Sequence, residues 1–352
     1  MLTTNRLKLE MDKIEKIIKW YLDSPIYIDG AYRAFYSSSK TGPIYPEITG
    51  YSISLSSILY TRRNDEQFLK RAKTSAEYMT KITKDGGAPS FSDNLLYTFD
   101  TAIYVSGVLD LYAVTKQDQY LQDAEKSLQW IMRLWKDKPF SAVNEIPAES
   151  AWYHQSAVHL VKLAIPFIKA SVYLRSSEYE NTALELLDKY AKFQTEDGSF
   201  IVTEGSDIVM AHPHCYATES YLYAYGALKK SELLKIAEKA INWLTKVQNS
   251  DGSFYRCYDI NNNVLDPLKT SDAIAQATRL WKLLGVNEKN VELAYRYLDS
   301  VMKDDGLRLF KRNSFRSKLA FNKSPVYSWP TFFYLHSLLL PFGEMKYWPE
   351  IF

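Results

Sequence analysis

The sequence predicts an all-α fold, an (α/α)6 toroid in which six helical hairpins form an inner and an outer ring of helices. Three observations lead to this prediction. An Asp-Gly dipeptide recurs at a step of 54 to 56 residues, an amphipathic helical segment comes before it, and a helical segment that is apolar almost all round comes after it. A fixed period of this length is typical of repeat architectures whose unit is one supersecondary element.

The Asp-Gly dipeptides begin at positions 29, 85, 197, 251 and 305, so the successive spacings are 56, 112, 54 and 54. Because 112 is two steps of 56, a unit without the dipeptide is expected near position 141, in the segment KDKPFSAVNEIP. Six units result. The longer motif Asp-Gly-Ser-Phe, at 197–200 and 251–254, is interpreted as a turn rather than a reaction site, with Gly252 in the left-handed region just after a helix.

Each unit contains two kinds of helix. In ELLKIAEKAINWLTKVQ, at 232–248, Leu233, Ala237 and Leu244 share one face, while Lys235 and Glu238 lie on the other. YLQDAEKSLQWIM and NTALELLDKYAKFQ show the same pattern, so these helices have one wet side. TAIYVSGVLDLYAV, CYATESYLYAYGAL and DAIAQATRLWKLLG lack a polar face and are predicted to be buried. Alternation of the two kinds predicts a ring of helices inside another ring.

An open solenoid of helical hairpins would show the same alternation. Closure is favoured because six is a common number for double-ring barrels and because the last segment, FFYLHSLLLPFGEMKYWPEIF, is too apolar for a polar cap. No Pro/Gly/Ser-rich linker interrupts the repeats, so residues 1–352 are expected to form a single domain.

Composition argues against several classes of protein. The 43 basic and 41 acidic side chains nearly balance, without a single-sign run, so no nucleic-acid partner is expected. No apolar stretch is long enough to span a membrane, and no signal peptide begins the chain, which favours a cytoplasmic location. Cys215 and Cys257 lack the spacing of a zinc pair, so neither metal nor cofactor is expected. We expect a monomer.

The inner helices of a toroid run parallel, so their N-terminal ends meet at one mouth. The polar residues that recur there include Glu47, Asp100, His214 and Asp272, which are the candidate catalytic residues. The candidate saccharide-binding residues are Tyr45, Tyr51, Tyr97, Trp152, His154, His212, Tyr216, Glu219, Tyr327 and Trp329.

Each candidate also has a structural interpretation. Asp100 and Asp272 stand where helix N-caps stand, and Glu47 could complement a helix dipole in the first turn. Single tyrosines are usually core residues, and His159 and His336 are expected to be structural. The functional interpretation depends on the convergence of carboxylates, imidazoles and aromatic rings at one opening.

The Asp-Gly-Ser-Phe links followed by buried helices resemble the repeats of terpenoid cyclase and protein prenyltransferase toroids. The whole chain resembles the toroid proteins of polysaccharide-biosynthesis and glycosylation gene clusters, which share their architecture with six-hairpin glycosidases, N-acylglucosamine epimerases and toroid polysaccharide lyases. The segments that carry this resemblance are YPEITGY at 45–51, YTFDTAIYVSGVLDLY at 97–112, HPHCYATESYLYA at 212–224 and SDAIAQATRLW at 271–281. The resemblance implies a toroid fold and carbohydrate chemistry, without selecting a reaction.

Residue chemistry narrows the choice. The chain has no DxDD or DDxxD motif for terpene cyclisation, and Cys215 has no second thiol for a prenyltransferase zinc site. Aromatic rings suit the C–H faces of sugars. Hydrolysis of a saccharide by paired carboxylates is therefore the first hypothesis. Epimerisation or lyase chemistry with a histidine or tyrosine base, and a non-catalytic saccharide-binding toroid, stay open as alternatives.

Overall fold

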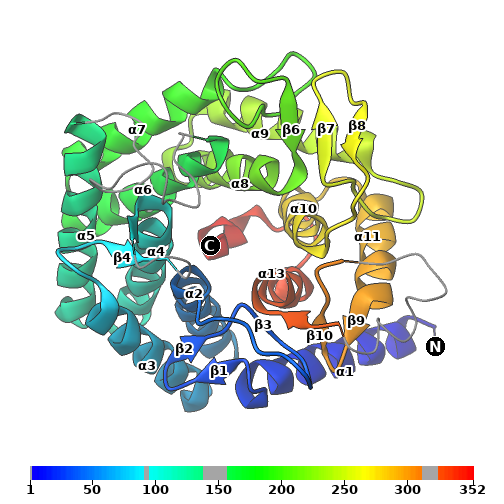
Figure 1. Cartoon of the computed structure of the whole chain (residues 1–352), viewed down its shortest axis with the longest axis horizontal. Coiled ribbons are helices and arrows are strands. Elements are labelled where there is room, and N and C mark those ends of the chain that lie inside the picture. Colours follow the sequence, from blue (N-terminus) through cyan, green and yellow to red (C-terminus); the bar gives the residue numbers. More distant parts are fainter. Residues whose placement is uncertain (1, 91–94, 138–156, 311–323) are drawn as a thin grey trace.

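The computed structural model describes residues 2–90, 95–137, 157–310 and 324–352, and in it the helices form two concentric rings (Figure 1). The outer ring contains α1 (Leu2–Asp23), α3 (Glu66–Ile82), α5 (Asp118–Asp137), α7 (Ser177–Ala191), α9 (Ser231–Val247) and α11 (Glu288–Val301). The inner ring contains α2 (Pro46–Arg63), α4 (Thr98–Thr115), α6 (Ala164–Leu174), α8 (Ala211–Leu228), α10 (Ser271–Leu284) and α13 (Ser328–Leu339). The predicted (α/α)6 toroid is confirmed, although the expected centre of the third unit, near residue 141, lies outside the described residues.

The ring is closed rather than open. Each inner helix contacts the next one, and α13 contacts both α2 and the outer helix α1. Strand β3 (Phe35–Tyr36) pairs antiparallel with β11 (Val326–Tyr327), so a segment from the first unit joins one from the last. Lys13 of α1 also forms an ion pair of 2.7 Å with Asp299 of α11. These contacts exclude the open solenoid.

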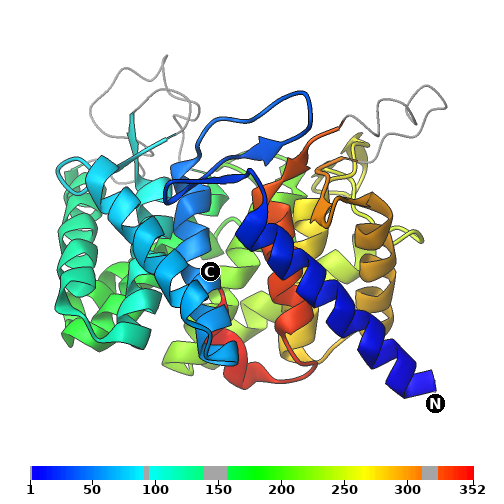
Figure 2. The same ribbon diagram turned by 90° about the horizontal axis from the view of Figure 1, so that it is seen from below.

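Short antiparallel strands gather at the end of the toroid where the inner helices begin (Figure 2). The strands other than β3 and β11 are β1 (Tyr27–Ile28), β2 (Ala31–Tyr32), β4 (Ala88–Pro89), β5 (Leu96–Tyr97), β6 (Ile208–Met210), β7 (Cys257–Asp259), β8 (Val264–Asp266), β9 (Met302–Lys303) and β10 (Gly306–Leu307). Strand β1 pairs with β2 and β4 with β5, while β7 pairs with both β6 and β8, and β10 pairs with both β9 and β11. The strands that immediately precede α4, α8 and α13 therefore hold the N-terminal ends of these helices in place.

The Asp-Gly motif forms a turn, as interpreted from the sequence, but its position relative to the helix differs from the prediction. Helix α9 ends at Val247 and the chain continues in extended backbone, so Gly252 belongs to a separate turn closed by its N–H on the carbonyl of Asn249 at 2.9 Å. Gly252 has φ +87°, and a Cβ there would lie 2.0 Å from the carbonyl oxygen of Leu293 in α11. Glycine is thus required both by the backbone angle and by close packing against the next outer helix.

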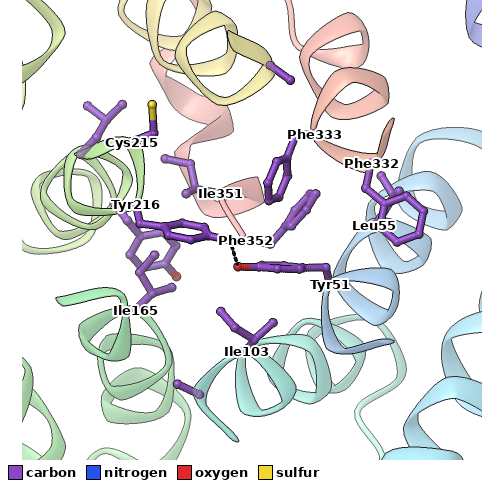
Figure 3. Packing of buried hydrophobic residues seen from close by; sticks show 14 of the residues in the cluster. Tyr51, Leu55, Ile103, Ile165, Cys215, Tyr216, Phe332, Phe333, Ile351 and Phe352 are labelled. Atoms are coloured by element: carbon purple, nitrogen blue, oxygen red, sulfur yellow. Dashed lines mark hydrogen bonds between the residues drawn. The ribbon is translucent and has the colours of Figure 1, made fainter. Parts of the chain in front are cut away.

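The bore of the inner ring is filled by side chains. Figure 3 shows Tyr51, Ile103, Tyr216 and Phe333 pointing from four inner helices toward the centre, where Phe352 lies among them. The ring centroid of Phe352 is 5.8 Å from that of Tyr51 and 6.1 Å from that of Phe333. Phe352 reaches this place after the short 3-10 helix η3 (Met345–Glu350), which approaches from the end opposite the strands (Figure 2). Among the described residues, Phe352 and the side chains around it therefore fill the bore on the side from which η3 approaches.

Candidate active site

A cavity of about 380 Å³ opens at the N-terminal ends of the inner helices. This volume falls within the range of small-molecule sites, about 300–1,000 Å³. The residues that line it are Tyr45, Glu47, Phe99, His159, His212, Pro213, Tyr216, Asp272 and Trp329.

Most of these side chains occupy the same position relative to the start of their helix, which we call the register rule. In five of the six inner helices, the residue two positions after the N-cap lines the cavity; these residues are Glu47, Phe99, His212, Asp272 and Trp329. The residues four positions further on are Tyr51, Ile103, Tyr216, Gln276 and Phe333, which form the next tier of the bore. Spacings of four and seven residues return to the same helix face, so each inner helix presents one polar and aromatic stripe to the centre.

Glu47 is almost fully buried in the wall of the cavity, with 6% of its surface exposed. The Tyr51 hydroxyl donates to the Tyr216 hydroxyl at 3.0 Å, and Tyr216 donates to Oε1 of Glu47 at 3.4 Å. Burial raises the pKa of Glu47 above its ordinary value, although hydrogen bonds from Tyr45 and Tyr216 oppose the rise. A carboxyl group in this state is suited to donate a proton.

Asp272 of α10 lines the same cavity as Glu47. Its Oδ2 accepts from the indole N–H of Trp329 at 3.2 Å and lies 3.8 Å from Nδ1 of His212. Its Oδ1 accepts from the backbone N–H of Ala273 at 2.8 Å. The alternative interpretation as an N-cap is wrong, because Thr270 precedes the helix in extended backbone and Asp272 stands in the first turn.

Asp100 is also not an N-cap, since Tyr97 occupies that position before α4. Asp100 is fully buried one residue beyond Phe99, and Phe99, rather than Asp100, lines the cavity. The Asp100 charge contributes to raising the pKa of Tyr45, behind the effects of burial and of Glu47, so the carboxylate lies close to the wall. The structure therefore brings Glu47 and Asp272 into one cavity and places Asp100 behind it.

The other predicted binding residues lie in different places. Tyr45, His212, Tyr216 and Trp329 line the cavity. Tyr327 stands at its edge, with its ring 5.1 Å from that of Trp329. Tyr51 and Glu219 lie one and two tiers deeper, Tyr97 is buried on β5, and Trp152 and His154 lie outside the described residues.

His214 is not at the cavity. Its Nδ1 accepts from the backbone N–H of Phe200 at 3.2 Å, and its Nε2 lies 3.1 Å from the carbonyl of Ala240. Thr49, Thr101 and Thr331 occupy the same position four residues after their N-caps, and the side chain of each accepts a backbone N–H from the strand that follows its Asp-Gly turn. His214 therefore joins the turn to the inner helix, and the structure removes it from the candidate catalytic residues.

We predict that His214→Thr folds and keeps turnover within a few-fold of the wild type. Burial lowers the pKa of His214 to about 3, so the folded protein holds it neutral while the unfolded chain takes up a proton near pH 6.5. The contribution of this neutral His214 to the free energy of unfolding is fully present above about pH 6.5 and is lost as the pH falls toward 3. In urea unfolding experiments between pH 6 and 4, the free energy of unfolding of the variant should depend less steeply on pH than that of the wild type, by up to about 1.4 kcal/mol per pH unit. A folded variant without turnover would contradict this assignment.

Sequence reasoning missed three lining residues, Phe99, His159 and Pro213. His159 was expected to be structural, but it lines the cavity with its ring 5.0 Å from that of Phe99. Burial and the neighbouring His212 lower the pKa of His159 to about 3, so it is neutral at physiological pH. The register rule would have identified Phe99, whereas η2 (Val158–Leu163), where His159 lies, departs from the regular hairpin pattern.

Beneath the cavity lies a buried ionic cluster centred on Glu219. Lys162 donates to its Oε2 at 2.5 Å, and Arg279 and Gln276 both donate to its Oε1. Burial alone would raise the pKa of Glu219, but Arg279 and Lys162 hold it below its ordinary value. Glu219 therefore carries its charge inside the bore, where it can orient neighbouring groups.

Neither a metal-binding cluster nor a membrane-spanning helix is found among the residues that the structure describes. No group of three or more His, Cys, Asp or Glu side chains among residues 2–90, 95–137, 157–310 and 324–352 could hold a metal ion. None of the helices in those same ranges is long and apolar enough to cross a membrane.

The fold and cavity define a closed helical toroid with an acidic and aromatic pocket at one mouth. The sequence matches no protein-family model, and no curated protein matches it significantly. Among solved structures, the chain is similar to D-mannose isomerase, with a TM-score of 0.75 and 11% identity over 94% of this chain and 96% of that one.

Two further neighbours have the same architecture. The cellobiose 2-epimerase of Bacillus thermoamylovorans has a TM-score of 0.72 and 14% identity over 96% of this chain and 100% of that one. An unsaturated glucuronyl hydrolase specific for heparin has a TM-score of 0.72 and 14% identity over 96% of this chain and 97% of that one. The expected resemblance to toroid glycosidases and sugar epimerases is therefore confirmed at the level of the fold.

Proposed function

We propose that this protein binds a saccharide in the cavity and hydrolyses a glycosidic bond there. The observation that carries the proposal is that Glu47 and Asp272, from different repeats, line one cavity with aromatic walls. Phe99 and Trp329 offer ring faces on which the C–H faces of a sugar can stack. The names of the structural neighbours, a glucuronyl hydrolase, an epimerase and an isomerase of sugars, support a saccharide as the ligand.

The two carboxyl groups have different environments, as glycoside hydrolysis requires. Glu47 is buried with a raised pKa and is the proposed general acid, which protonates the leaving glycosidic oxygen. Asp272 accepts N–H hydrogen bonds from Trp329 and Ala273 and is the proposed carboxylate that activates water or attacks the sugar. Together they supply one proton to the leaving group and one base or nucleophile to the anomeric carbon.

A second candidate is isomerisation or epimerisation of a reducing sugar. It is favoured by His212, which lines the cavity and is oriented through Nδ1 by a 2.6 Å hydrogen bond to Gln276. As a base, His212 would remove the proton from the carbon next to the carbonyl of the open-chain sugar. Return of that proton to the carbonyl carbon, while the proton of the neighbouring hydroxyl moves to the former carbonyl oxygen, gives the isomer. Return of the proton to the opposite face of the carbon that lost it gives the epimer.

Product analysis by NMR in D₂O distinguishes the two reactions. The substrates tested are cellobiose, mannose and unsaturated heparin disaccharides. Hydrolysis creates new reducing ends, without deuterium on carbon in the case of cellobiose, whereas isomerisation of an aldose places deuterium on the former carbonyl carbon, C1, and epimerisation places it at C2. We expect the hydrolytic pattern. If these sugars and a wider set of oligosaccharides and uronates are unchanged and none raises the melting temperature, the proposal is wrong.

A further inference from the structure

We infer that Gln276, held by Glu219, is a positioning residue that fixes His212 as the tautomer with its proton on Nδ1 and a lone pair on Nε2. The inference rests on the proposed function, because it concerns the same cavity, and it applies to either reaction. It assigns roles to two residues that lie below the cavity wall and do not line it.

The first step is the fixed charge of Glu219. Its side chain is 1% exposed, as is the residue Lys162 beside it. Lys162 Nζ also donates to the carbonyl of Phe352 at 2.8 Å and lies 4.7 Å from the ring centroid of Tyr216. With Lys162 and Arg279 on either side, the Glu219 carboxylate has little freedom to rotate, and as an ionised group it can only accept hydrogen bonds.

The second step is the orientation of Gln276. This side chain is fully buried on α10, between Glu219 of α8 and His212 of α8. Because Glu219 only accepts, the end of the amide that faces it must be the NH₂ group, which donates to Oε1 of Glu219 at 3.3 Å. The carbonyl end then faces His212, with Oε1 of Gln276 2.6 Å from Nδ1 of the imidazole.

The third step is the tautomer of His212. A carbonyl oxygen cannot donate, so the hydrogen in the 2.6 Å contact belongs to Nδ1 of His212. In the neutral ring, Nε2 then has no proton and can accept one. The ring itself is held against Tyr216, with centroids 4.4 Å apart, so it has little room to flip.

The consequence for the site is a defined proton acceptor, the unprotonated Nε2 of a ring that lines the cavity, while the Asp272 carboxylate lies on the Nδ1 side of that ring. In the hydrolytic reaction Nε2 accepts a hydrogen bond from a sugar hydroxyl, and in the isomerisation it accepts the proton from carbon. A ring in the other tautomer would present an N–H and could do neither. Gln276 and Glu219 therefore act through His212, without touching the substrate.

The test is the ¹⁵N NMR spectrum of the histidine-labelled protein at neutral pH, with the His212 signals assigned by their loss in His212→Asn. The wild type should show a protonated Nδ1 and an unprotonated Nε2. Gln276→Met removes both the carbonyl acceptor and the amide donor, and should produce a mixture of tautomers. Gln248→Met serves as the matched control, since Gln248 bonds the carbonyls of Gly252 and Asn290 at an outer joint, and should leave the His212 signals unchanged.

Turnover of the sugar that the wild type converts is the second measurement. In folded Gln276→Met, kcat should fall by about 10- to 100-fold with a smaller change in KM, as for other groups that orient a reacting residue. A protonated Nε2 in the wild type, or an unchanged tautomer in Gln276→Met, would overturn the inference. If the tautomers behave as expected but no saccharide reacts, the inference stands and the proposed function fails instead.

Discussion

Glu47→Gln is expected to lower kcat for saccharide hydrolysis by on the order of 10²- to 10⁴-fold, the usual contribution of a general acid. The amide keeps the size of the carboxyl group and still accepts a hydrogen bond from Tyr216, but it cannot donate a proton to the leaving oxygen. Initial rates of the wild type and the variant on the same sugar, together with their circular dichroism spectra, provide the comparison.

Glu66→Gln is the matched control for this substitution. Glu66 is an exposed glutamate in the first turn of the outer helix α3, far from the cavity lining, and its variant should keep wild-type kcat. Turnover of Glu47→Gln at the control rate would eliminate Glu47 as the acid. A comparable loss in both variants would trace the effect to folding rather than to proton donation.

Glu219→Gln is expected to be the most destabilising of the substitutions considered, with a loss of about 3–5 kcal/mol in the free energy of unfolding. The change leaves Lys162 and Arg279 as buried cations without their counter-ion. Chemical denaturation at neutral pH measures the loss. Asp251→Asn, which removes an ion pair between the exposed Asp251 and Lys269, should cost less than about 1 kcal/mol.

The same cluster predicts a dependence on pH. Because Arg279 and Lys162 lower the pKa of folded Glu219 below its unfolded value of 4.5, its contribution is present above that pH and is lost as the pH falls through the folded value. The difference in stability between wild type and Glu219→Gln should therefore shrink in acid. A difference that is small at neutral pH, or that grows as the pH falls below 4.5, would contradict a charged Glu219.

The fold was predictable because the same pattern of turn and helices recurs several times along the chain. The Asp-Gly spacing revealed the units, and the contrast between one-faced and all-apolar helices separated the outer ring from the inner one. The sequence did not reveal that Gly252 meets the backbone of α11, because that contact joins neighbouring units and has no local signature. The prediction that Gly252 directly follows a helix was therefore wrong.

The site was predictable only in part. Parallel inner helices placed the candidates at one mouth, and Glu47, Asp272 and His212 indeed share a cavity. A shift of one residue on a helix turns a side chain by about 100°, so Phe99 enters the cavity while Asp100 stands behind it. The prediction that His214 lies at the cavity was wrong for a different reason. His214 replaces the threonine that makes the same hydrogen bond to the backbone in three other units.

The pairing of Gln276 with His212 could not be inferred from the chain, because the two residues are on different helices and meet only after the ring closes. Nor does any local pattern identify Lys162, an isolated lysine in an apolar segment, as the partner of Glu219. Such contacts depend on the radius of the inner ring and on the relative heights of its helices. The tiers of the bore become visible only when the helices are aligned at their N-caps.

The decisive experiment is a crystal structure of Glu47→Gln soaked with the saccharide that the wild-type protein turns over. We expect a sugar ring in the cavity between Phe99 and Trp329, with the scissile oxygen within hydrogen-bond distance of residue 47 and the anomeric carbon on the side of Asp272. A sugar bound elsewhere on the toroid, with this cavity empty, would contradict this expectation.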